Sequence, residues 1–420
     1  MKSKSLSSTA HLSGTAKPRF GEALVRRGLL RQLEKIKTGA LDLVEGDTRH
    51  RFGDRSAACA DAEITVLDPR FYTDVAFGGS IGAGEAYMDG SWRCNDLVGL
   101  TRLLLRNNHV MDGMDSGLAR LTAPLQKLYR WVNRNSKDGA RRNIAAHYDL
   151  GNEFFSLWLD PTMMYSSAIF PSPETSLHEA QLHRLEHICQ RLELGSEDHV
   201  IEIGTGWGGF AVHAAQNHGC RVTTTTISQE QFDLATERVR SAGLQDRVTV
   251  LKDDFRDLRG RFDKLVSIEM IEAVGHELFA SFFKACSELL KPNGAMLVQA
   301  ITMADQRYDY YRRNVDFIQR YIFPGGALPS SAVMADAAAK QTDLRLLGLE
   351  DIGLHYATTL RHWRHNFFEQ IEEVRRQGFP DAFIRMWEFY LTTCEGAFLE
   401  RAISNVQMLL TKPACRLKTL

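Results

Sequence analysis

The sequence predicts an α/β fold whose main part is a doubly wound, mostly parallel sheet, preceded by a smaller α+β domain. From about residue 143 onward, short apolar runs rich in β-branched residues recur at regular intervals, at 200–203, 221–227, 247–251, 264–268 and 295–301. Stretches of helical character lie between these runs. Strands that alternate with helices form mostly parallel sheets that helices cover on both faces.

The composition is that of an ordinary globular protein with more than one core, since 44% of the 420 residues are hydrophobic and 25% are charged. A formal net charge of -1 gives no general attraction to a polyanion, so we expect no nucleic-acid partner. The seven cysteines are scattered, with neither CxxC nor Cys/His ligand spacing. This pattern indicates reduced thiols in a cytoplasmic protein and predicts no metal site.

The two ends of the chain are expected to be tails, at 1–20 and 411–420. The first of these is polar and lacks the apolar core of a secretory signal, which predicts a flexible segment. No window approaches the roughly 18 apolar residues that span a bilayer.

Residues 21–110 are expected to form the N-terminal domain. The run 62–67 predicts a strand, and the glycine-rich stretches 77–80 and 81–84 predict turns.

Residues 111–142 predict a linker that contains an amphipathic basic helix. Apolar residues recur at helical spacing, and cations accompany them: Leu118, Leu121, Leu125, Leu128 and Trp131, with Lys127, Arg130, Arg134, Lys137, Arg141 and Arg142. Two interpretations stay open. The helix is either a solvated element packed on the next domain or a basic surface that faces anionic headgroups, worth about 1 kcal/mol per cation.

The sharpest local pattern is an apolar strand that ends in Gly-x-Gly-x-Gly-Gly and enters a helix, with glycines at Gly204, Gly206 and Gly208. Glycine allows a sharp turn and lets a ligand lie against bare peptide groups near a helix N-terminus. The spacing is not GxGxxG, and Glu202 precedes the first glycine by two positions. These details favour S-adenosylmethionine over a nicotinamide cofactor, and a degenerate site is the remaining alternative.

Polar residues also follow the second and third strands of this sheet. Thr226 and Gln231 are candidates for contact with a cofactor ribose, although either could cap the helix that starts at Ser228. Asp254 offers a carboxylate for an adenine amino group and Phe255 an aromatic face. The alternative is an acidic turn beside a core phenylalanine.

Motifs over roughly 80–410 resemble those of bacterial cyclopropane-fatty-acyl-phospholipid synthases. From residue 143 onward the chain is also similar to the mycolic acid cyclopropane synthases and methyltransferases. The matching segments are 84–90, 144–155, 164–168, the Gly204 loop, 254–258, 267–275 and 356–360. The resemblance implies a seven-stranded methyltransferase (Rossmann-like) sheet over 143–410. It also implies S-adenosylmethionine bound by Tyr165, Ser166, Gly204, Gly206, Thr226, Gln231, Asp254 and Phe255.

The resemblance further implies that an acyl-chain alkene attacks the sulfonium methyl group and that a bound bicarbonate removes a proton before the ring closes. The corresponding pocket here comprises Ser167, Glu272, Gln299, Ile301 and Tyr356. Two positions depart from the family pattern, because Ser167 replaces a cysteine and Gln299 replaces a histidine. Glutamine cannot carry a positive charge, so bicarbonate binding and ring closure stay open.

A reactive cation on an acyl chain requires a dry pocket lined with aromatic faces. The aromatic-rich segment 308–326, within an insertion near 303–330, is therefore interpreted as part of the acyl-chain cover, with an ordinary buried helix as the alternative. Glu272 is expected at the carboxyl end of a parallel strand, where open α/β sheets bind ligands, although a helix cap is also compatible.

Four functions follow from these observations. The first is cyclopropanation of unsaturated phospholipid acyl chains, and the second is a related alkene methylation without ring closure. Methylation of a small soluble nucleophile and lipid binding with a vestigial cofactor site are the others. The first implies a cytoplasmic protein that acts at the inner face of the membrane. Members of the family are often dimers through the N-terminal domain, which makes a homodimer an expectation.

Overall fold

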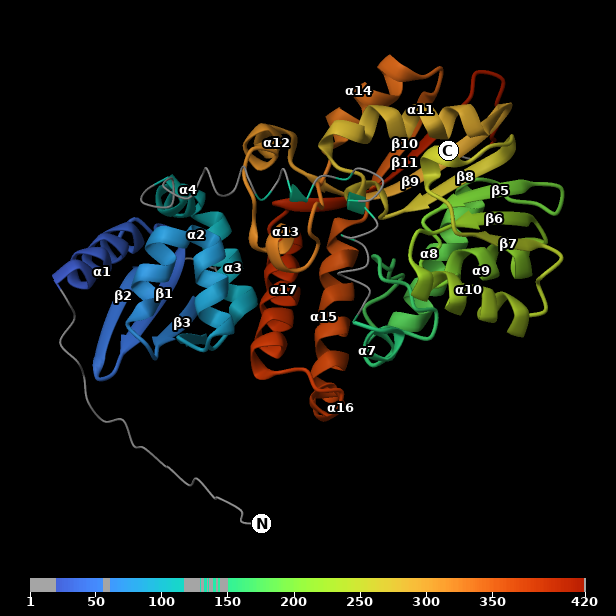
Figure 1. Ribbon diagram of the computed structural model, residues 1–420. Coiled ribbons are helices and arrows are strands. Elements are labelled where there is room, and N and C mark those ends of the chain that lie inside the picture. Colours follow the sequence, from blue (N-terminus) through green and yellow to red (C-terminus); the bar gives the residue numbers. More distant parts are fainter. Residues whose placement is uncertain are drawn as a thin grey trace, which may run out of the picture.

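The computed structural model describes residues 20–55, 61–116 and 150–418, together with a few single residues between 129 and 143 (Figure 1). The predicted N-terminal tail and most of the predicted linker helix lie outside the described residues. Within the described residues, no helix combines the length and the apolar character needed to cross a membrane.

The N-terminal part is an α+β unit, as the sequence predicted. Its four-stranded sheet has the order β2-β1-β3-β4. The elements are α1 (Phe20–Leu33), β1 (Gly39–Glu45), β2 (Thr48–Asp54), β3 (Asp61–Val66), α2 (Arg70–Met88), β4 (Trp92–Cys94), α3 (Leu97–Arg106) and α4 (Asn108–Ser116).

The turns predicted at 77–84 are wrong, because these residues lie inside α2. The helix is kinked at Gly79, whose φ of 59° is not helical. A Cβ at Gly82 would lie 1.9 Å from the Asp74 carbonyl oxygen, and one at Gly84 would lie 2.4 Å from the Phe317 ring. The glycines therefore serve a kink and a close helix contact rather than a chain reversal.

The main sheet has seven strands in the order β10-β11-β9-β8-β5-β6-β7, which confirms the predicted class. Strands β5 to β9 pair in parallel, while β11 pairs antiparallel with both β9 and β10. The bounds are β5 (His199–Ile203), β6 (Arg221–Thr225), β7 (Val248–Leu251), β8 (Phe262–Ile268), β9 (Leu290–Met303), β10 (Arg345–Asp351) and β11 (Ile403–Thr411).

Helices cover both faces of this sheet (Figure 1). On one face lie α8 (Leu177–Arg191), α9 (Gly209–His218) and α10 (Gln229–Ser241); on the other lie α11 (Phe279–Leu289) and α14 (Ser331–Gln341). The connection after β9 carries α12 (Asp305–Tyr311) and α13 (Phe317–Tyr321). Short 3-10 turns among the described residues lie at Phe255–Asp257, Ile271–Ala273 and His276–Leu278.

The segment of the chain that connects β10 to β11 forms a helical layer, which the sequence did not predict. It comprises α15 (Gly353–Glu369), α16 (Ile371–Arg376) and α17 (Asp381–Leu399) and stands between the two sheets in Figure 1. Helix α17 binds the N-terminal unit through polar contacts, since the Tyr87 hydroxyl donates to Glu388 and both Arg102 and Arg106 pair with Glu400.

With α7 (Asn152–Ser156), this layer encloses an aromatic core. Its fully buried rings include Phe154, Phe155, Trp158, Trp207, Trp363, Phe367 and Trp387. The predicted C-terminal tail also differs from expectation. Lys412 pairs with Asp343, and Cys415 and Leu417 pack against the core between α8 and the sheet.

Candidate active site

The strand order reverses between β5 and β8. From β5 the chain continues outward through β6 and β7 on one side, and from β8 through β9 on the other. Ligands of open α/β sheets bind at the carboxyl ends of the strands where the order reverses in this way. The glycine loop follows β5 and the segment around Glu272 follows β8, so both predicted parts of the site lie at this position.

The glycine loop after β5 has the backbone of a ligand cradle. Gly204, Gly206 and Gly208 have φ of 98°, 53° and 85°. The amides of Gly204 and Thr205 both donate to the Thr225 carbonyl oxygen, at 3.1 and 3.0 Å, which ties the loop to β6. A Cβ at Gly206 would meet no atom within 4 Å, so open space lies beside its peptide groups. Since α9 starts at Gly209, a ligand there would also meet a helix N-terminus.

Glu202 lies beneath this loop. It is buried, and its Oε2 accepts a hydrogen bond from the Thr224 hydroxyl at 2.6 Å. Thr224 is in turn 2.7 Å from the Thr205 hydroxyl, in the loop itself. Burial raises the pKa of Glu202 to about 8. In this structure the carboxyl group therefore orients the loop through two threonines.

The polar residues after β6 and β7 bond mainly to one another. The Thr226 hydroxyl donates to Gln231 Oε1 at 2.8 Å, while Ser228 caps α10. Asp254 accepts hydrogen bonds from the Arg256 backbone amide at 3.0 Å and from its Nε at 2.7 Å. The Phe255 ring packs edge-on against Phe282, with 5.6 Å between centroids. These residues lie at the expected edge of the sheet, next to the glycine loop.

A dense polar cluster surrounds Glu269, which directly follows β8. Its Oε1 accepts hydrogen bonds from the Ser167 amide at 2.9 Å and from Gln299 Nε2 at 2.8 Å. Asn405 Nδ2 also donates to Oε1, at 2.5 Å. The Tyr356 hydroxyl donates to Oε2 at 2.8 Å. Three of the five residues predicted to hold bicarbonate therefore bind a carboxylate that the protein itself supplies.

The conformation of Glu269 is unusual. Its φ of 50° lies in the left-handed region, which costs a non-glycine residue roughly 1–2 kcal/mol. Burial raises the pKa of its carboxyl group, while hydrogen bonds from Ser167, Gln299 and Tyr356 act in the opposite direction. Strained backbone at a buried, multiply bonded carboxylate is typical of a functional site.

Glu272 lies close to Glu269 but is bonded differently. Its Oε1 accepts the Ile301 amide at 2.5 Å, which brings two predicted residues together. Its Oε2 is buried and has no hydrogen-bond partner among the described residues. Burial and, second, the charge of Glu269 raise the pKa of Glu272 to about 8. This carboxyl group is therefore able to carry a proton near neutral pH.

Sequence reasoning missed both Glu269 and Asn405. Glu269 lies within the family-matching segment 267–275, three residues before Glu272. A charged residue directly after a predicted strand could therefore have indicated it as a site residue. Asn405 comes from β11, and no local pattern connects it to the site. Gln407, two positions further on, donates to Gln299 Oε1 at 3.1 Å and fixes the orientation of that amide.

Tyr165 connects the site to the aromatic core, and Ser166 connects it to Arg184 on α8. The Tyr165 hydroxyl lies 2.9 Å from the Tyr390 hydroxyl, and its ring packs on Trp158 and Trp363 at 5.4 and 5.2 Å. The Ser166 hydroxyl accepts from Arg184 Nη2 at 2.9 Å.

Arg184 is completely buried on α8. Its Nε and Nη1 have no hydrogen-bond partner among the described residues, and desolvation lowers its pKa to about 10. Its positive charge acts on Glu269 and Glu202.

The aromatic segment 308–326 is divided between core and surface. Phe323 packs against Tyr165 and Tyr390, at 6.1 and 6.2 Å between ring centroids. Tyr311 is buried, whereas Tyr310 is 45% exposed. The part of the segment near Phe323 therefore borders the site.

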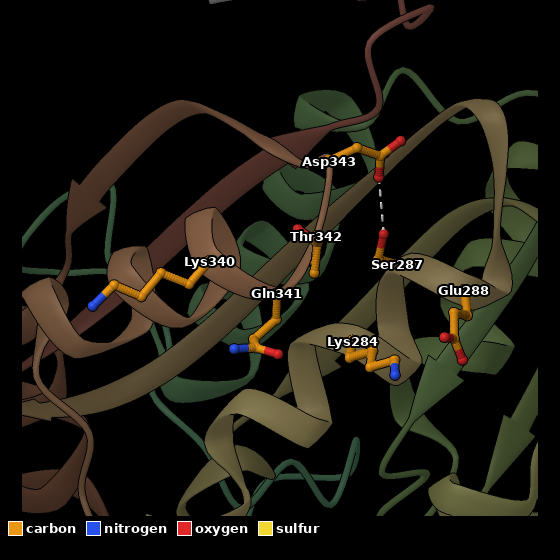
Figure 2. Close-up of a pocket in the computed structure, with 7 residues that line it drawn as sticks. All are labelled: Lys284, Ser287, Glu288, Lys340, Gln341, Thr342 and Asp343. Atoms are coloured by element: carbon orange, nitrogen blue, oxygen red, sulfur yellow. Dashed lines mark hydrogen bonds between the residues drawn. The ribbon is translucent and has the colours of Figure 1, made fainter.

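A separate hollow lies between α11 and α14 (Figure 2). It is lined by Lys284, Ser287, Glu288, Lys340, Gln341, Thr342 and Asp343, and the Ser287 hydroxyl donates to Asp343 at 3.1 Å. Because α11 leads directly into the start of β9, this hollow lies at the amino ends of the strands, at the opposite edge of the sheet from the glycine loop.

Solved structures with this architecture define the class of the protein. The chain superimposes on the cyclopropane synthase MmaA2 from Mycobacterium tuberculosis with a TM-score of 0.60 and 28% identity, over 65% of this chain and 98% of that one. The mycolic acid cyclopropane synthase CmaA1, complexed with SAH and CTAB, gives a TM-score of 0.60 and 27% identity, with the same coverage. The fold and the glycine loop are those of an S-adenosylmethionine-dependent methyltransferase.

Sequence relatives identify the family. The model of the mycolic acid cyclopropane synthetase family matches residues 135–408. Tuberculostearic acid methyltransferase UfaA1 of Mycobacterium tuberculosis is 40% identical over 76% of each chain. Cyclopropane-fatty-acyl-phospholipid synthase of Escherichia coli is 36% identical over 84% of this chain and 88% of its own. The chain belongs to the mycolic acid cyclopropane synthetase family, whose members methylate or cyclopropanate fatty acyl chains with S-adenosylmethionine.

Proposed function

We propose that this enzyme alkylates the double bond of unsaturated phospholipid acyl chains at a membrane surface and uses Glu269 as its proton acceptor. The observation that carries the proposal is the buried Glu269 carboxylate, which is held by Ser167, Gln299, Tyr356 and Asn405. When bound at the glycine loop, S-adenosylmethionine supplies an electrophilic methyl group. The open space beside Gly206 and the start of α9 suit this cofactor.

The proposed chemistry needs a base but no nucleophile from the protein. The π electrons of the alkene form the new carbon–carbon bond to the methyl group, the carbon–sulfur bond breaks, and a cation remains on the acyl chain. Glu269 then accepts a proton from the chain. Because two of its four donors are a backbone amide and a tyrosine hydroxyl, the carboxylate is held in place before the reaction.

The surroundings of Glu269 suit a short-lived cation. Tyr165 joins this region to the rings of Trp158, Trp363 and Phe155, all within 5.5 Å between centroids. Aromatic faces stabilise cations by about 0.5–2 kcal/mol each, and a dry site prevents capture of the cation by water.

Two products are compatible with proton transfer to Glu269. If the new methyl group loses its proton while the adjacent carbon carries the charge, a cyclopropane ring closes. If a hydride first moves so that the methylated carbon carries the charge, loss of the same proton gives a methylene branch. The main alternative to cyclopropanation is therefore the methylene branch. Two observations support this alternative: Glu269 takes the place of an exchangeable anion, and the chain is similar to UfaA1.

Product analysis tests the function. The purified enzyme is incubated with vesicles of dioleoyl phosphatidylglycerol and methyl-labelled S-adenosylmethionine, and the released fatty acids are examined by mass spectrometry and proton NMR. We expect one labelled carbon per modified chain, with high-field ring protons for a cyclopropane or vinyl protons for a methylene branch. Label that appears only in soluble products, or none in any acyl chain, contradicts the proposal.

The role of Glu269 is tested by chemical rescue. Glu269→Gly removes the carboxylate, and glycine accepts the φ of 50° without strain. We expect this variant to lose turnover and to regain part of it when bicarbonate is added, because the vacated donors can then hold the external anion. Wild-type turnover should not respond to bicarbonate. Full activity of Glu269→Gly without bicarbonate contradicts the assigned role.

A further inference from the structure

Helices α8 and α9 bring together side chains of the kinds that bind transition metals. One ligand atom from each of Cys189, His213 and His218 lies within 4.8 Å of the others. Glu186 faces the two histidines, and its Oε2 lies 3.3 Å from His213 Nε2 and 3.0 Å from His218 Nε2. Figure 1 shows α8 and α9 as neighbours on one face of the main sheet.

These separations are close to those of a tetrahedral zinc centre. Zinc bonds of about 2.0–2.2 Å to nitrogen and oxygen place neighbouring ligand atoms about 3.3 Å apart, and a sulfur at about 2.3 Å adds a few tenths of an ångström. The Glu186–histidine distances already match this edge length. The cysteine–histidine group, whose ligand atoms lie within 4.8 Å, would need to contract by at most about 1.5 Å, within the reach of side-chain rotation.

Neighbouring residues provide the second layer of contacts that metal sites require. Gln190 Nε2 donates to Glu186 Oε1 at 2.9 Å, which leaves Oε2 directed at the histidines. The side-chain amide of Asn217 lies 3.1 Å from His213 Nδ1, and the carbonyl end of the same amide can accept the Nδ1 proton of a metal-bound imidazole. Cys189 is fully buried, whereas the Glu186 side chain is 35% exposed, so an ion can enter from the Glu186 side.

We propose that Glu186, Cys189, His213 and His218 form a zinc site that joins α8 to α9. On binding, the Cys189 thiol releases its proton to solvent, and the histidines bind as neutral imidazoles. One thiolate and one carboxylate then balance the two positive charges of zinc, so the centre is neutral overall. A thiolate with two imidazoles selects zinc over magnesium or calcium.

The site is structural, because four protein ligands leave no open position for substrate. Its helices lead directly to the active site. Gln181 and Arg184, five and two residues before Glu186 on α8, bond to Ser166, while α9 begins at the glycine loop. Zinc would therefore hold together the two helices on which the cofactor loop and Ser166 rest.

Metal binding is tested on the full-length protein after removal of metal with a chelator. Cobalt(II), the spectroscopic substitute for zinc, is titrated in, and we expect one equivalent to produce a thiolate-to-cobalt charge-transfer band together with the visible bands of tetrahedral cobalt. Zinc should displace the cobalt and raise the unfolding temperature, because it binds only the folded state.

Variants identify the ligands. We expect Cys189→Ala to abolish the charge-transfer band and His218→Ala or Glu186→Gln to weaken binding at least tenfold. Cys286→Ala, which alters another fully buried helical cysteine, should bind like the wild type. If Cys189→Ala does not fold, the partly exposed His218 and Glu186 variants still decide the question. Absence of tetrahedral cobalt bands, or binding unchanged in His218→Ala and Glu186→Gln, overturns the proposal.

Discussion

The two halves of the candidate active site are built in different ways. The half that follows β5 consists of backbone, since three glycines with positive φ turn a single loop toward a helix N-terminus. The half that follows β8 consists of side chains from separate segments, which converge on one carboxylate. In the proposed mechanism, the first half binds the cofactor by exposing peptide groups, and the second half acts by holding one buried charge. Substitutions should therefore separate cofactor binding from turnover.

The largest effect is expected in the half made of side chains. Glu269→Gln keeps the size of the side chain but removes the proton acceptor, so we expect turnover to fall about 10²–10⁴-fold. Cofactor affinity, measured by calorimetry with S-adenosylhomocysteine, should change less than about threefold. Glu277→Gln, in an exposed turn of the same segment, serves as the control. An equal loss of affinity and turnover in Glu269→Gln would show that the two halves are not separable.

Substitutions in the half made of backbone should lower cofactor affinity. Gly206→Ala places a side chain at a φ of 53° and toward the open space of the loop, so we expect cofactor affinity to fall about tenfold. Gly243→Ala is the matched control, because Gly243 has a φ of 68° and open space around it but lies at the end of α10. Both variants should lose similar stability, and only Gly206→Ala should lose affinity. Similar affinity losses in both would indicate general destabilisation.

The smallest expected effect is the change of protein stability with pH that Glu272 causes. The folded-state pKa of Glu272 is raised to about 8 from an ordinary value of 4.5, so the folded protein retains a proton that the unfolded chain releases. The associated stability is present below about pH 4.5 and is lost as the pH rises through 8. Each pKa unit corresponds to about 1.4 kcal/mol. We expect the wild-type unfolding temperature to fall by several degrees between pH 6 and 9.

The variant Glu272→Gln, which cannot titrate, should show a smaller decline over the same range. Glu202, with a similarly raised pKa, keeps part of the dependence in both proteins. Parallel curves for the two proteins would mean that Glu272 titrates normally in the folded state.

Most of the features that the sequence predicted correctly depend on residues that are close together in the chain. The five strands of the parallel region, the helix that begins at Ser228 and the glycine loop each depend on a local pattern of apolar, β-branched or glycine residues. The N-terminal glycines show the limit of such patterns. They indicated turns, yet they lie within a kinked helix in which Gly84 packs against Phe317, more than 200 residues away.

The sequence by itself determined the fold class, the cofactor loop and the candidate residues Ser167, Glu272, Gln299 and Tyr356, because each belongs to a recognisable segment. Only the tertiary structure decided that a carboxylate of the protein occupies the centre of that group. Asn405 and Tyr356 reach Glu269 from β11 and α15, elements whose positions depend on sheet order. The same reason applies to the proposed zinc ligands. Their spacings along the chain carry no pattern, and they meet only because α8 and α9 pack on the same face of the sheet.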